Sequence, residues 1–227
     1  MTSPPGRVSG ARASGPLSQE GPGLLVMDVD STLIEQEVIE LLADYAGVRE
    51  QVARVTERAM RGELDFAASL HERVAALRGV PQAALARVAE EVRLTAGATG
   101  LIEELHARGC RVGVVSGGFE EIVLPLARRL RIDHAAANRL ELRDGALTGR
   151  VVGGVVDRDE KARLLRAWAH HDGVPMERTV AVGDGANDLG MIAAAGLGVA
   201  FCAKSVVVEQ APAAVHVRDL RAVLELL

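Results

Sequence analysis

Two carboxylates two residues apart, Asp28 and Asp30, directly follow a short run of large apolar residues at 24–27. This run predicts a buried parallel strand whose carboxyl end opens onto solvent, where ligands of open α/β sheets bind. Two close carboxylates repel each other unless a cation or a shared proton compensates, and Mg²⁺ prefers such oxygen ligands. From these residues alone, an acidic loop in which Asp30, Ser31 or Thr32 caps the next helix is an open alternative.

A second acidic segment follows a predicted strand at 179–182. Asp184 stands between two glycines, and Asp188 follows four residues later. Flanking glycines permit a tight bend, so the two carboxylates can converge on one point and form a metal site in outline. Asn187 or Asp188 could instead cap the helix that follows.

Two further segments offer groups that bind anions. Ser116, Gly117 and Gly118 follow a predicted strand and precede a predicted helix, so backbone N–H groups and the hydroxyl could cradle a phosphate. Lys161 lies in the first turn of a predicted helix at 158–171, where the helix dipole disfavours a cation unless an anion is near. Taken singly, the first pattern is more often a helix cap and the second more often a solvated surface lysine, so neither alone decides for an anion site.

All four segments fall where one crevice of a parallel sheet would gather them. A carboxylate, a hydroxyl, a lysine and a second carboxylate around Mg²⁺ are the parts of a phosphoryl-transfer site, where positioning and charge neutralisation do most of the catalysis. The combination therefore favours phosphoryl transfer over four unrelated caps and turns.

The elements that must position these residues alternate between helix and strand. Strands are predicted at 24–27, 111–115, 179–182 and 197–200, helices at 98–108, 120–131, 158–171, 187–195 and 219–227, and an Asp-Gly hairpin at 140–152. Between 34 and 93 the apolar spacing is helical throughout. This alternation predicts an α/β fold with a doubly wound parallel sheet and an α-helical cap inserted after the first strand.

Three regions are expected. We predict an α/β core domain over residues 24–33 and 95–227 and a helical cap domain over residues 34–94. Residues 1–23 are predicted to be a disordered tail, because they are rich in Gly, Ser and Pro and hold almost no large apolar residue.

Composition excludes several classes of function. The 227 residues are 48% hydrophobic and carry a net charge of -5, which disfavours duplex nucleic acid and an anionic membrane as partners. Aromatic residues make up 2%, too few to stack on single-stranded nucleic acid. No apolar run reaches the roughly 18 residues of a membrane helix. Cys110 and Cys202 form neither a disulfide framework nor a zinc motif, so we expect a cytoplasmic location.

In this order, the four segments resemble the motifs of the haloacid dehalogenase superfamily: D-x-D-x-T, a strand-end Ser or Thr, a Lys, and G-D-x-x-x-D. Within that superfamily the chain looks like the phosphoserine phosphatase family in the segments DVDSTLI, AMRGELDFAASLHERV, VVSGGF, ANRL, LTG and AVGDGANDL. The resemblance runs from about Leu24 to the C-terminus. It implies a Rossmann-like core with a cap, and Mg²⁺-dependent hydrolysis of O-phospho-L-serine to L-serine and phosphate, the last step of serine biosynthesis, through an aspartyl-phosphate.

The resemblance also implies catalytic and metal-binding roles. Asp28 would attack phosphorus, and Asp30 would protonate the departing serine oxygen and then deprotonate the attacking water. The side chains of Asp28 and Asp184 and the backbone carbonyl of Asp30 would bind Mg²⁺, with Asp188 and Thr32 supporting the site.

Phosphate and substrate ligands are implied in the same way. The groups expected to bind phosphoryl oxygens are Ser116, the Gly117 N–H, Lys161 and Asn187. In the cap, Glu37 would bind the substrate ammonium and Arg73 its carboxylate, because a guanidinium donates two parallel hydrogen bonds. Met60 aligns with a pocket position, although Met60 and Phe66 also fit the apolar core of the cap.

Two alternatives stay open. The enzyme could act on another small phosphomonoester or transfer the phosphoryl group to another alcohol. A non-enzymatic switch phosphorylated on aspartate would use similar residues, but a base at Asp30 and a cap over the site both oppose it. The sequence leaves a monomer and a homodimer equally open.

Overall fold

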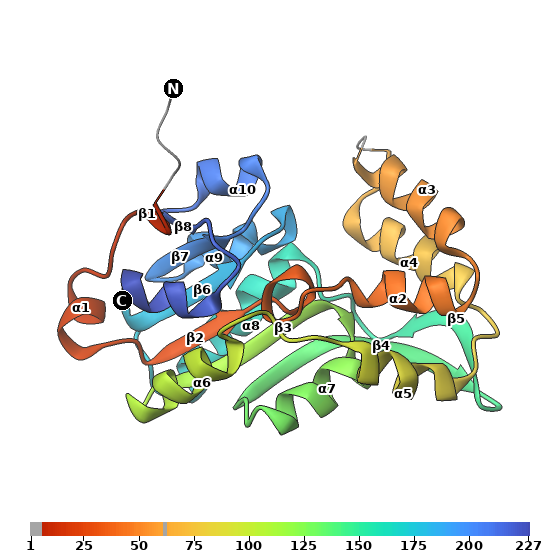
Figure 1. Cartoon of the computed structure of the whole chain (residues 1–227), viewed down its shortest axis with the longest axis horizontal. Coiled ribbons are helices and arrows are strands. Elements are labelled where there is room, and N and C mark those ends of the chain that lie inside the picture. The colour runs from red at the N-terminus through yellow and green to blue at the C-terminus, as the bar shows by residue number, and fades with distance from the viewer. Residues whose placement is uncertain (1–5, 61–62) are drawn as a thin grey trace.

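One eight-stranded sheet organises the residues described by this computed structural model, 6–60 and 63–227, with only the backbone described at 59–60 (Figure 1). The strands are β1 Val8–Gly10, β2 Leu24–Met27, β3 Arg111–Phe119, β4 His134–Arg143, β5 Ala146–Val152, β6 Thr179–Gly183, β7 Leu197–Phe201 and β8 Ala213–Val215. Their order across the sheet is β1-β8-β7-β6-β2-β3-β4-β5. The predicted α/β class with a doubly wound sheet is confirmed.

Strand β2 lies at the point where the strand order reverses. It pairs in parallel with β3 on one side and β6 on the other, and Met27 lies opposite both Val114 and Val182. All four of its residues are fully buried, because helices cover both faces of the sheet. Residues that follow β2, β3 and β6 therefore emerge together at the topological switch point, where ligands of such sheets bind.

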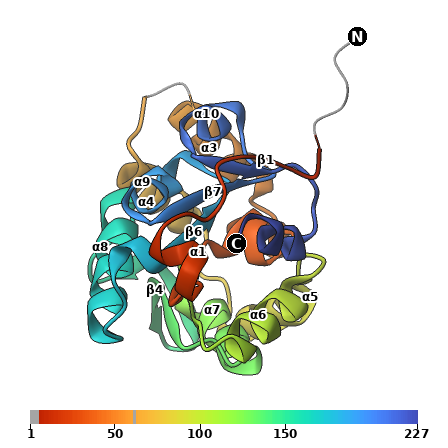
Figure 2. The ribbon, with the colours of Figure 1, turned by 90° about the vertical axis from the view of Figure 1, so that its left-hand side faces the viewer.

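Helices cover both faces of the sheet (Figure 2). Helices α6 Ala98–Ala107 and α7 Glu120–Arg129 and the 3₁₀ helix η4 Leu220–Leu226 cover one face, and α8 Arg158–His171, α9 Leu189–Ala194 and α10 Ser205–Gln210 cover the other. Alternate residues of β2 belong to different cores, since Leu25 and Met27 pack on one face and Leu24 and Val26 on the other.

Four helices connect β2 to α6, namely α2 Val38–Tyr45, α3 Arg49–Met60, α4 Phe66–Ala76 and α5 Gln82–Glu91. They lie beyond the carboxyl ends of the central strands (Figure 1). The β4–β5 hairpin anchors the turn between α4 and α5, because Leu147 N–H donates to the Val80 oxygen and Gly79 N–H to the Leu147 oxygen, both at 2.8 Å. The division into core and cap domains stays a prediction.

The expectation of a disordered tail is not met over residues 6–23. Strand β1 pairs antiparallel with β8, helix α1 Pro16–Glu20 buries Leu17, and Arg7 pairs with Asp219 at 3.1 Å. The open edge of β8 offers unpaired backbone groups that even a polar segment can satisfy, and composition does not register this. Residues 1–5 lie outside the described part of the chain.

Other boundaries moved by a few residues. Strand β3 continues to Phe119 through a register shift after Val115, where a turn was expected. The last predicted helix is the 3₁₀ helix η4, and helix 187–195 begins as the 3₁₀ turn η3 Ala186–Asp188. Within the described ranges, no helix has the length and apolar character that a membrane span requires.

Helix α9 packs so closely on β7 that a side chain at Gly198 would meet the backbone oxygen of Ile192. Because backbone cannot move aside as a side chain can, we expect Gly198→Ala to lower the free energy of unfolding by about 1 to 3 kcal/mol in urea denaturation. Gly154→Ala, at a glycine with open space around its Cβ position, is the matched control and should change it by less than about 0.5 kcal/mol. Equal effects of the two substitutions would contradict the close packing.

Candidate active site

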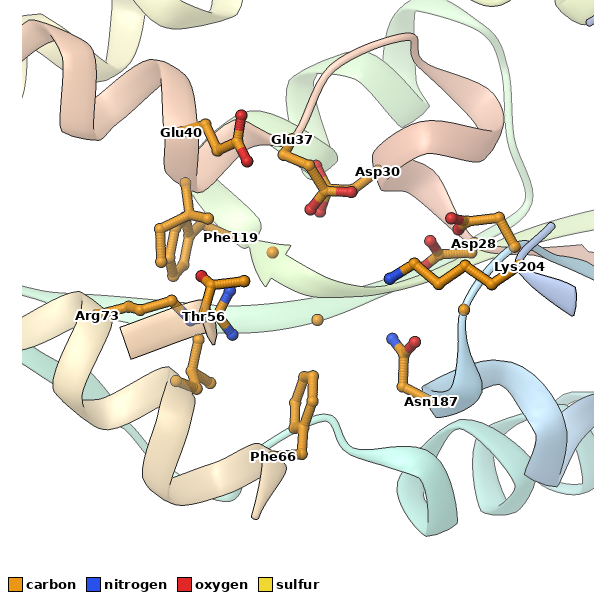
Figure 3. Close-up of a pocket in the computed structure, with 16 residues that line it drawn as sticks. Asp28, Asp30, Glu37, Glu40, Thr56, Phe66, Arg73, Phe119, Asn187 and Lys204 are labelled. Atoms are coloured by element: carbon orange, nitrogen blue, oxygen red, sulfur yellow. The ribbon is translucent and has the colours of Figure 1, made fainter. Parts of the chain in front are cut away.

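A cavity of ≈ 280 Å³ lies where β2, β3 and β6 end, between the sheet and helices α2 to α4 (Figure 3). Its wall contains seven of the predicted site residues: Asp28, Asp30, Glu37, Arg73, Gly117, Asp184 and Asn187. Four others, Thr32, Ser116, Lys161 and Asp188, are fully buried behind that wall. The fold therefore gathers residues that are up to 159 positions apart in sequence, from Asp28 to Asn187.

Lys161 connects two of the acidic segments from beneath the cavity. Its Nζ donates to Asp28 Oδ1 at 2.5 Å and to Asp188 Oδ1 at 2.6 Å, and its side chain has no exposed surface. Burial alone would lower the pKa of the ammonium, but the Asp188 and Asp28 charges outweigh this and raise it. The first-turn lysine thus has the compensating anions that the helix dipole demands.

Burial shifts the pKa of Asp28 in the opposite direction to that of Lys161. Burial raises the pKa of its carboxyl, and the Lys161 ammonium opposes that shift. The Asp28 backbone N–H donates to the Val182 oxygen at 2.9 Å, which ties the end of β2 to β6. One carboxylate oxygen is thus fixed by Lys161, and the side chain faces the cavity (Figure 3).

Asp188 is satisfied on both carboxylate oxygens. Oδ1 accepts from Lys161, while Oδ2 accepts from the N–H groups of Asp184 at 3.1 Å and Gly185 at 2.9 Å. A side chain at Gly183 would collide with Asp188, so only glycine allows this approach. Asp188 therefore orients the loop that carries Asp184, and the supporting role that the resemblance implies for it stays a prediction.

The donor set fits a divalent cation. Carboxylate oxygens of Asp28, Asp184 and Asp188 lie within 4.8 Å of one another. Burial raises the pKa of Asp184 to about 6, the Asp188 charge adds to the shift, and Lys204 opposes it. Thr32 Oγ1 donates to Asp184 at 3.4 Å. Crowded carboxylates that resist ionisation are stabilised by a hard cation that takes oxygen ligands, and Mg²⁺ is one.

Asp30 is poised between its two protonation states. Burial raises the pKa of its carboxyl to about 7, and the nearby Glu37 charge adds to the shift. The Val38 N–H donates to Oδ1 at 3.0 Å and the Ser116 hydroxyl to Oδ2 at 3.3 Å, which orients the group. Such a pKa suits a group that must give and take a proton near neutrality.

The Ser116 to Gly118 segment is braced by a residue that the sequence analysis did not assign. Gly118 N–H donates to Ser116 Oγ at 2.8 Å, and the buried Asn138 donates from Nδ2 to the Gly117 oxygen at 2.8 Å. Asn138 Oδ1 also accepts from Val156 N–H at 2.8 Å. The segment ANRL contained the signal, since an asparagine among apolar residues of a strand needs hydrogen-bond partners when it is buried.

Glu37, which directly precedes α2, and Arg73 of α4 face the cavity (Figure 3). Ser31 Oγ donates to Glu37 at 2.7 Å, and Arg73 Nε donates to the Ser69 oxygen at 3.3 Å. Burial lowers the pKa of the Arg73 guanidinium, although the Glu37 charge opposes this. Glu37 and Arg73 thus present an anion and a cation to a ligand in the cavity.

Two predictions for apolar cap residues have different outcomes. Phe66, expected in the apolar core, lies on the cavity wall, where a side chain at Gly117 would meet its ring at 2.8 Å. The helical period could not distinguish these sites, because the cavity occupies part of the apolar face of α4. The Met60 side chain is outside what the structure describes, so its role stays a prediction.

Among the described residues of the cavity wall, sequence reasoning missed three polar ones, Glu40, Thr56 and Lys204. Glu40 and Thr56 carry no motif. Lys204 had a signal: of the 26 Lys and Arg residues, Lys161 and Lys204 are the two lysines, and Lys204 follows a predicted strand as a site residue would.

Comparisons with known proteins agree with this geometry. The family model for haloacid dehalogenase-like hydrolases matches residues 25–193. A phosphoserine phosphatase of Streptococcus thermophilus is 53% identical over 205 residues, which cover 90% of this chain and 95% of that protein. One of Streptomyces coelicolor is 59% identical over 204 residues, where the chain spans about half of the relative's length (50%).

Solved structures give the same result. A phospho-aspartyl intermediate analogue of phosphoserine phosphatase superposes with a TM-score of 0.85 and 43% identity, covering 90% of this chain and 98% of that one. A substrate-bound phosphoserine phosphatase complex gives a TM-score of 0.85 at 43% identity, with 90% and 97% coverage.

The raised carboxyl pKa values predict how the stability of the metal-free protein depends on pH. Asp30 titrates at about 7 when folded and near 3.8 when unfolded, so its stabilising proton is fully bound below pH 3.8 and lost as pH rises to about 7. In EDTA, the Tm of Asp30→Asn should therefore exceed that of the wild type at pH 8, and the difference should shrink at pH 5.

The control for that measurement is Asp144→Asn, which removes one carboxylate from the exposed hairpin turn. Its Tm difference from the wild type should stay constant between pH 5 and pH 8. A Tm difference for Asp30→Asn that is equally independent of pH would contradict the raised pKa.

Proposed function

The chain belongs to the haloacid dehalogenase-like hydrolase family, and from that premise we propose that it hydrolyses O-phospho-L-serine to L-serine and inorganic phosphate. One observation carries the proposal. Lys161 fixes the Asp28 carboxylate at the cavity wall, and Asp30 lies two residues further on with a pKa of about 7. A fixed nucleophile beside a group that can give and take a proton is what a two-step phosphatase needs.

Asp28 acts as the nucleophile in this proposal. Its carboxylate oxygen attacks phosphorus, the bond to the serine oxygen breaks, and an aspartyl-phosphate forms, which divides one difficult displacement into two. Lys161 holds Asp28 in one orientation and favours the ionised carboxylate that attack requires.

Asp30 acts first as an acid and then as a base. It protonates the departing serine oxygen, and the resulting carboxylate takes a proton from the water that hydrolyses the aspartyl-phosphate. Its hydrogen bonds from Val38 N–H and from the Ser116 hydroxyl keep it oriented through both steps.

Mg²⁺ would be held by the side chains of Asp28 and Asp184 and by the backbone carbonyl of Asp30. When bound, it supplies the positive charge that lets phosphate approach several carboxylates. Asp188 and Thr32 support the site through their hydrogen bonds with the Asp184 segment.

Phosphoryl oxygens would be bound by Ser116, the Gly117 N–H, Lys161 and Asn187. Gly117 and Asn187 line the cavity, while Ser116 and Lys161 lie behind its wall and bond the catalytic carboxylates. A phosphoryl group transferred to Asp28 would compete for these same donors. Binding of the group would thus be coupled to reaction at Asp28.

Selectivity for phosphoserine would come from Glu37 and Arg73. A cavity of ≈ 280 Å³ suits a small ligand, and its cap side offers an anion for an ammonium and a cation for a carboxylate. We also propose that Met60 contacts the substrate. We propose that residues 34–94 act as a cap domain over a core of 24–33 and 95–227 and exclude water during phosphoryl transfer.

We also propose a cytoplasmic location, which is supported by Cys110 and Cys202, because both cysteines are unpaired. Another small phosphomonoester as the preferred substrate is the main alternative. A phospho-aspartate switch is disfavoured, because Asp30 offers a base to hydrolyse the phosphorylated form. Monomer and homodimer stay equally open.

Release of inorganic phosphate tests the activity. We expect turnover of O-phospho-L-serine with Mg²⁺, and loss of turnover in EDTA, because Mg²⁺ offsets the repulsion between phosphate and the carboxylates. Asp28→Asn should reduce kcat by at least about 10³-fold, since it removes the nucleophile. An unchanged circular dichroism spectrum is the control for folding, and an active Asp28→Asn variant would sink the mechanism.

Paired substrates test the cap residues. Glu37→Gln and Arg73→Gln should each lower kcat/KM for phosphoserine by about 10²-fold or more, because one charged substrate group loses its partner. Both should change kcat/KM for p-nitrophenyl phosphate far less, since that ester has neither an ammonium nor a carboxylate. Equal losses on the two substrates would exclude the assigned roles.

A further inference from the structure

The cavity wall is strongly acidic for a site that must accept phosphate. Among the residues that the structure describes, five carboxylates line it: Asp28, Asp30, Glu37, Glu40 and Asp184. Within that described part of the wall, the cations are Arg73 and Lys204. A phosphomonoester with two phosphate charges is repelled by such a wall unless a cation meets it on entry.

The two wall cations lie on opposite sides of the cavity. In the view of Figure 3, Arg73 reaches the cavity from α4 at one end, whereas Lys204 extends into it at the other end, where Asp28 and Asn187 are drawn. In that view, Asp28, the proposed nucleophile, lies on the Lys204 side of the cavity and Arg73 lies on the other side (Figure 3). A substrate with one phosphate and one carboxylate end could place one anion near each cation.

The backbone around Lys204 is fixed to the metal-binding loop. Its N–H donates to the Asp184 oxygen at 3.3 Å, and the Cys202 N–H donates to the Val215 oxygen at 2.8 Å. Cys202 adopts a φ of 45°, which turns the chain sharply at the end of β7. The base of the Lys204 side chain is thus held at the cavity rim by two strands and a loop.

The ammonium at the end of that side chain is available. Lys204 is an exposed residue, and within residues 6–60 and 63–227 its Nζ has no hydrogen bond or ion pair. Lys161 is the opposite case, since it is fully buried and its two short contacts are to Asp28 and Asp188. Before a ligand binds, the lysine of the superfamily motif is thus bonded to these two carboxylates, and Lys204 is the lysine that solvent and an incoming ligand can reach.

We propose that Lys204 captures the phosphoryl group of the incoming substrate at the cavity rim and guides it toward Asp28. This role rests on the proposed phosphatase function and deepens it. The ammonium pairs with nonbridging phosphoryl oxygens as the substrate enters, and its flexible stem lets the charge follow the group inward. Lys204 thus serves substrate capture and phosphate binding, while Arg73 receives the other anionic end.

Two substitutions of Lys204 and one control substitution elsewhere test this role with phosphoserine as substrate and Mg²⁺ present. Lys204→Gln should lower kcat/KM by about 5- to 20-fold at low salt, lower kcat less, and flatten the decline of kcat/KM with added NaCl. Inorganic phosphate should inhibit it about 5-fold less strongly. Lys204→Arg should keep most of the wild-type kcat/KM and its salt dependence.

Arg143→Gln is the matched control, since it removes one positive charge from the exposed end of the β4–β5 hairpin and lines no part of the cavity. It should match the wild type in kcat/KM and in phosphate inhibition. If it reproduces the Lys204→Gln effect, net charge rather than Lys204 is responsible and the proposal fails.

A chemical experiment uses the two lysines of the chain. N-hydroxysulfosuccinimidyl acetate should acylate Lys204 and spare the buried Lys161, and 10 mM inorganic phosphate with Mg²⁺ should slow the modification of Lys204 in peptide mass spectra. The reagent should lower kcat/KM of the wild type and leave Lys204→Arg at its starting value. No protection by phosphate would contradict capture at Lys204.

The outcomes separate the two proposals. A wild-type enzyme that does not hydrolyse phosphoserine overturns the substrate assignment, and calorimetric binding of inorganic phosphate to the wild type and Lys204→Gln then decides the role of Lys204. A Lys204→Gln variant that equals the wild type at every salt concentration overturns the capture role alone. Equal losses of kcat and kcat/KM with unchanged phosphate inhibition also overturn it.

Discussion

The ammonium of Lys161, buried without any exposed surface, is the interaction on which the site depends. An unpaired charge at that depth would cost several kcal/mol, so the fold must supply anions at that place. It supplies Asp28 from the end of β2 and Asp188 from the turn after β6, while the lysine itself comes from α8. Three separate segments are thereby held at one point. Asp28, the proposed nucleophile, is therefore ordered by the same contacts that stabilise the buried charge of Lys161.

The sheet order makes that convergence possible. Because β2 lies between β3 and β6 with all three strands parallel, their carboxyl ends deliver the Asp28, Ser116 and Asp184 segments to one edge. Close approach then requires glycine at Gly183, where a side chain would collide with Asp188. Asn138 on β4 adds a brace from the next strand. Strand order, small residues and buried hydrogen bonds thus act together to fix a polar cluster that repulsion would otherwise scatter.

The cations of the site have different roles. Lys161 neutralises carboxylates beneath the site, and Arg73 and Lys204 face the space a ligand would occupy. Burial raises the pKa of the Asp28 and Asp184 carboxyls, the Asp188 charge adds to both shifts, and a divalent cation between the two carboxyls would favour their ionised forms. The carboxylates that are proposed to bind the metal and perform the chemistry therefore also repel phosphate from the cavity. An exposed cation at the rim of the cavity offsets this repulsion.

The sequence by itself determined the class of the fold and most of the chemistry. Apolar runs and their spacing predicted β2, β3, β6, β7 and the helices between them, because burial imposes a regular spacing of apolar residues that can be read from the order of residues in the chain. The acids, the glycines and Lys161 could be read as phosphoryl-transfer residues because each type has few roles at the end of a strand. Only the tertiary structure decided which donors face the cavity and which lie behind its wall, as with Gly117 and Ser116. It also decided the pairing of β1 with β8, the brace at Asn138 and the position of Lys204. Those features depend on contacts between segments distant in sequence, and no local pattern of polarity encodes which distant partner a side chain will meet.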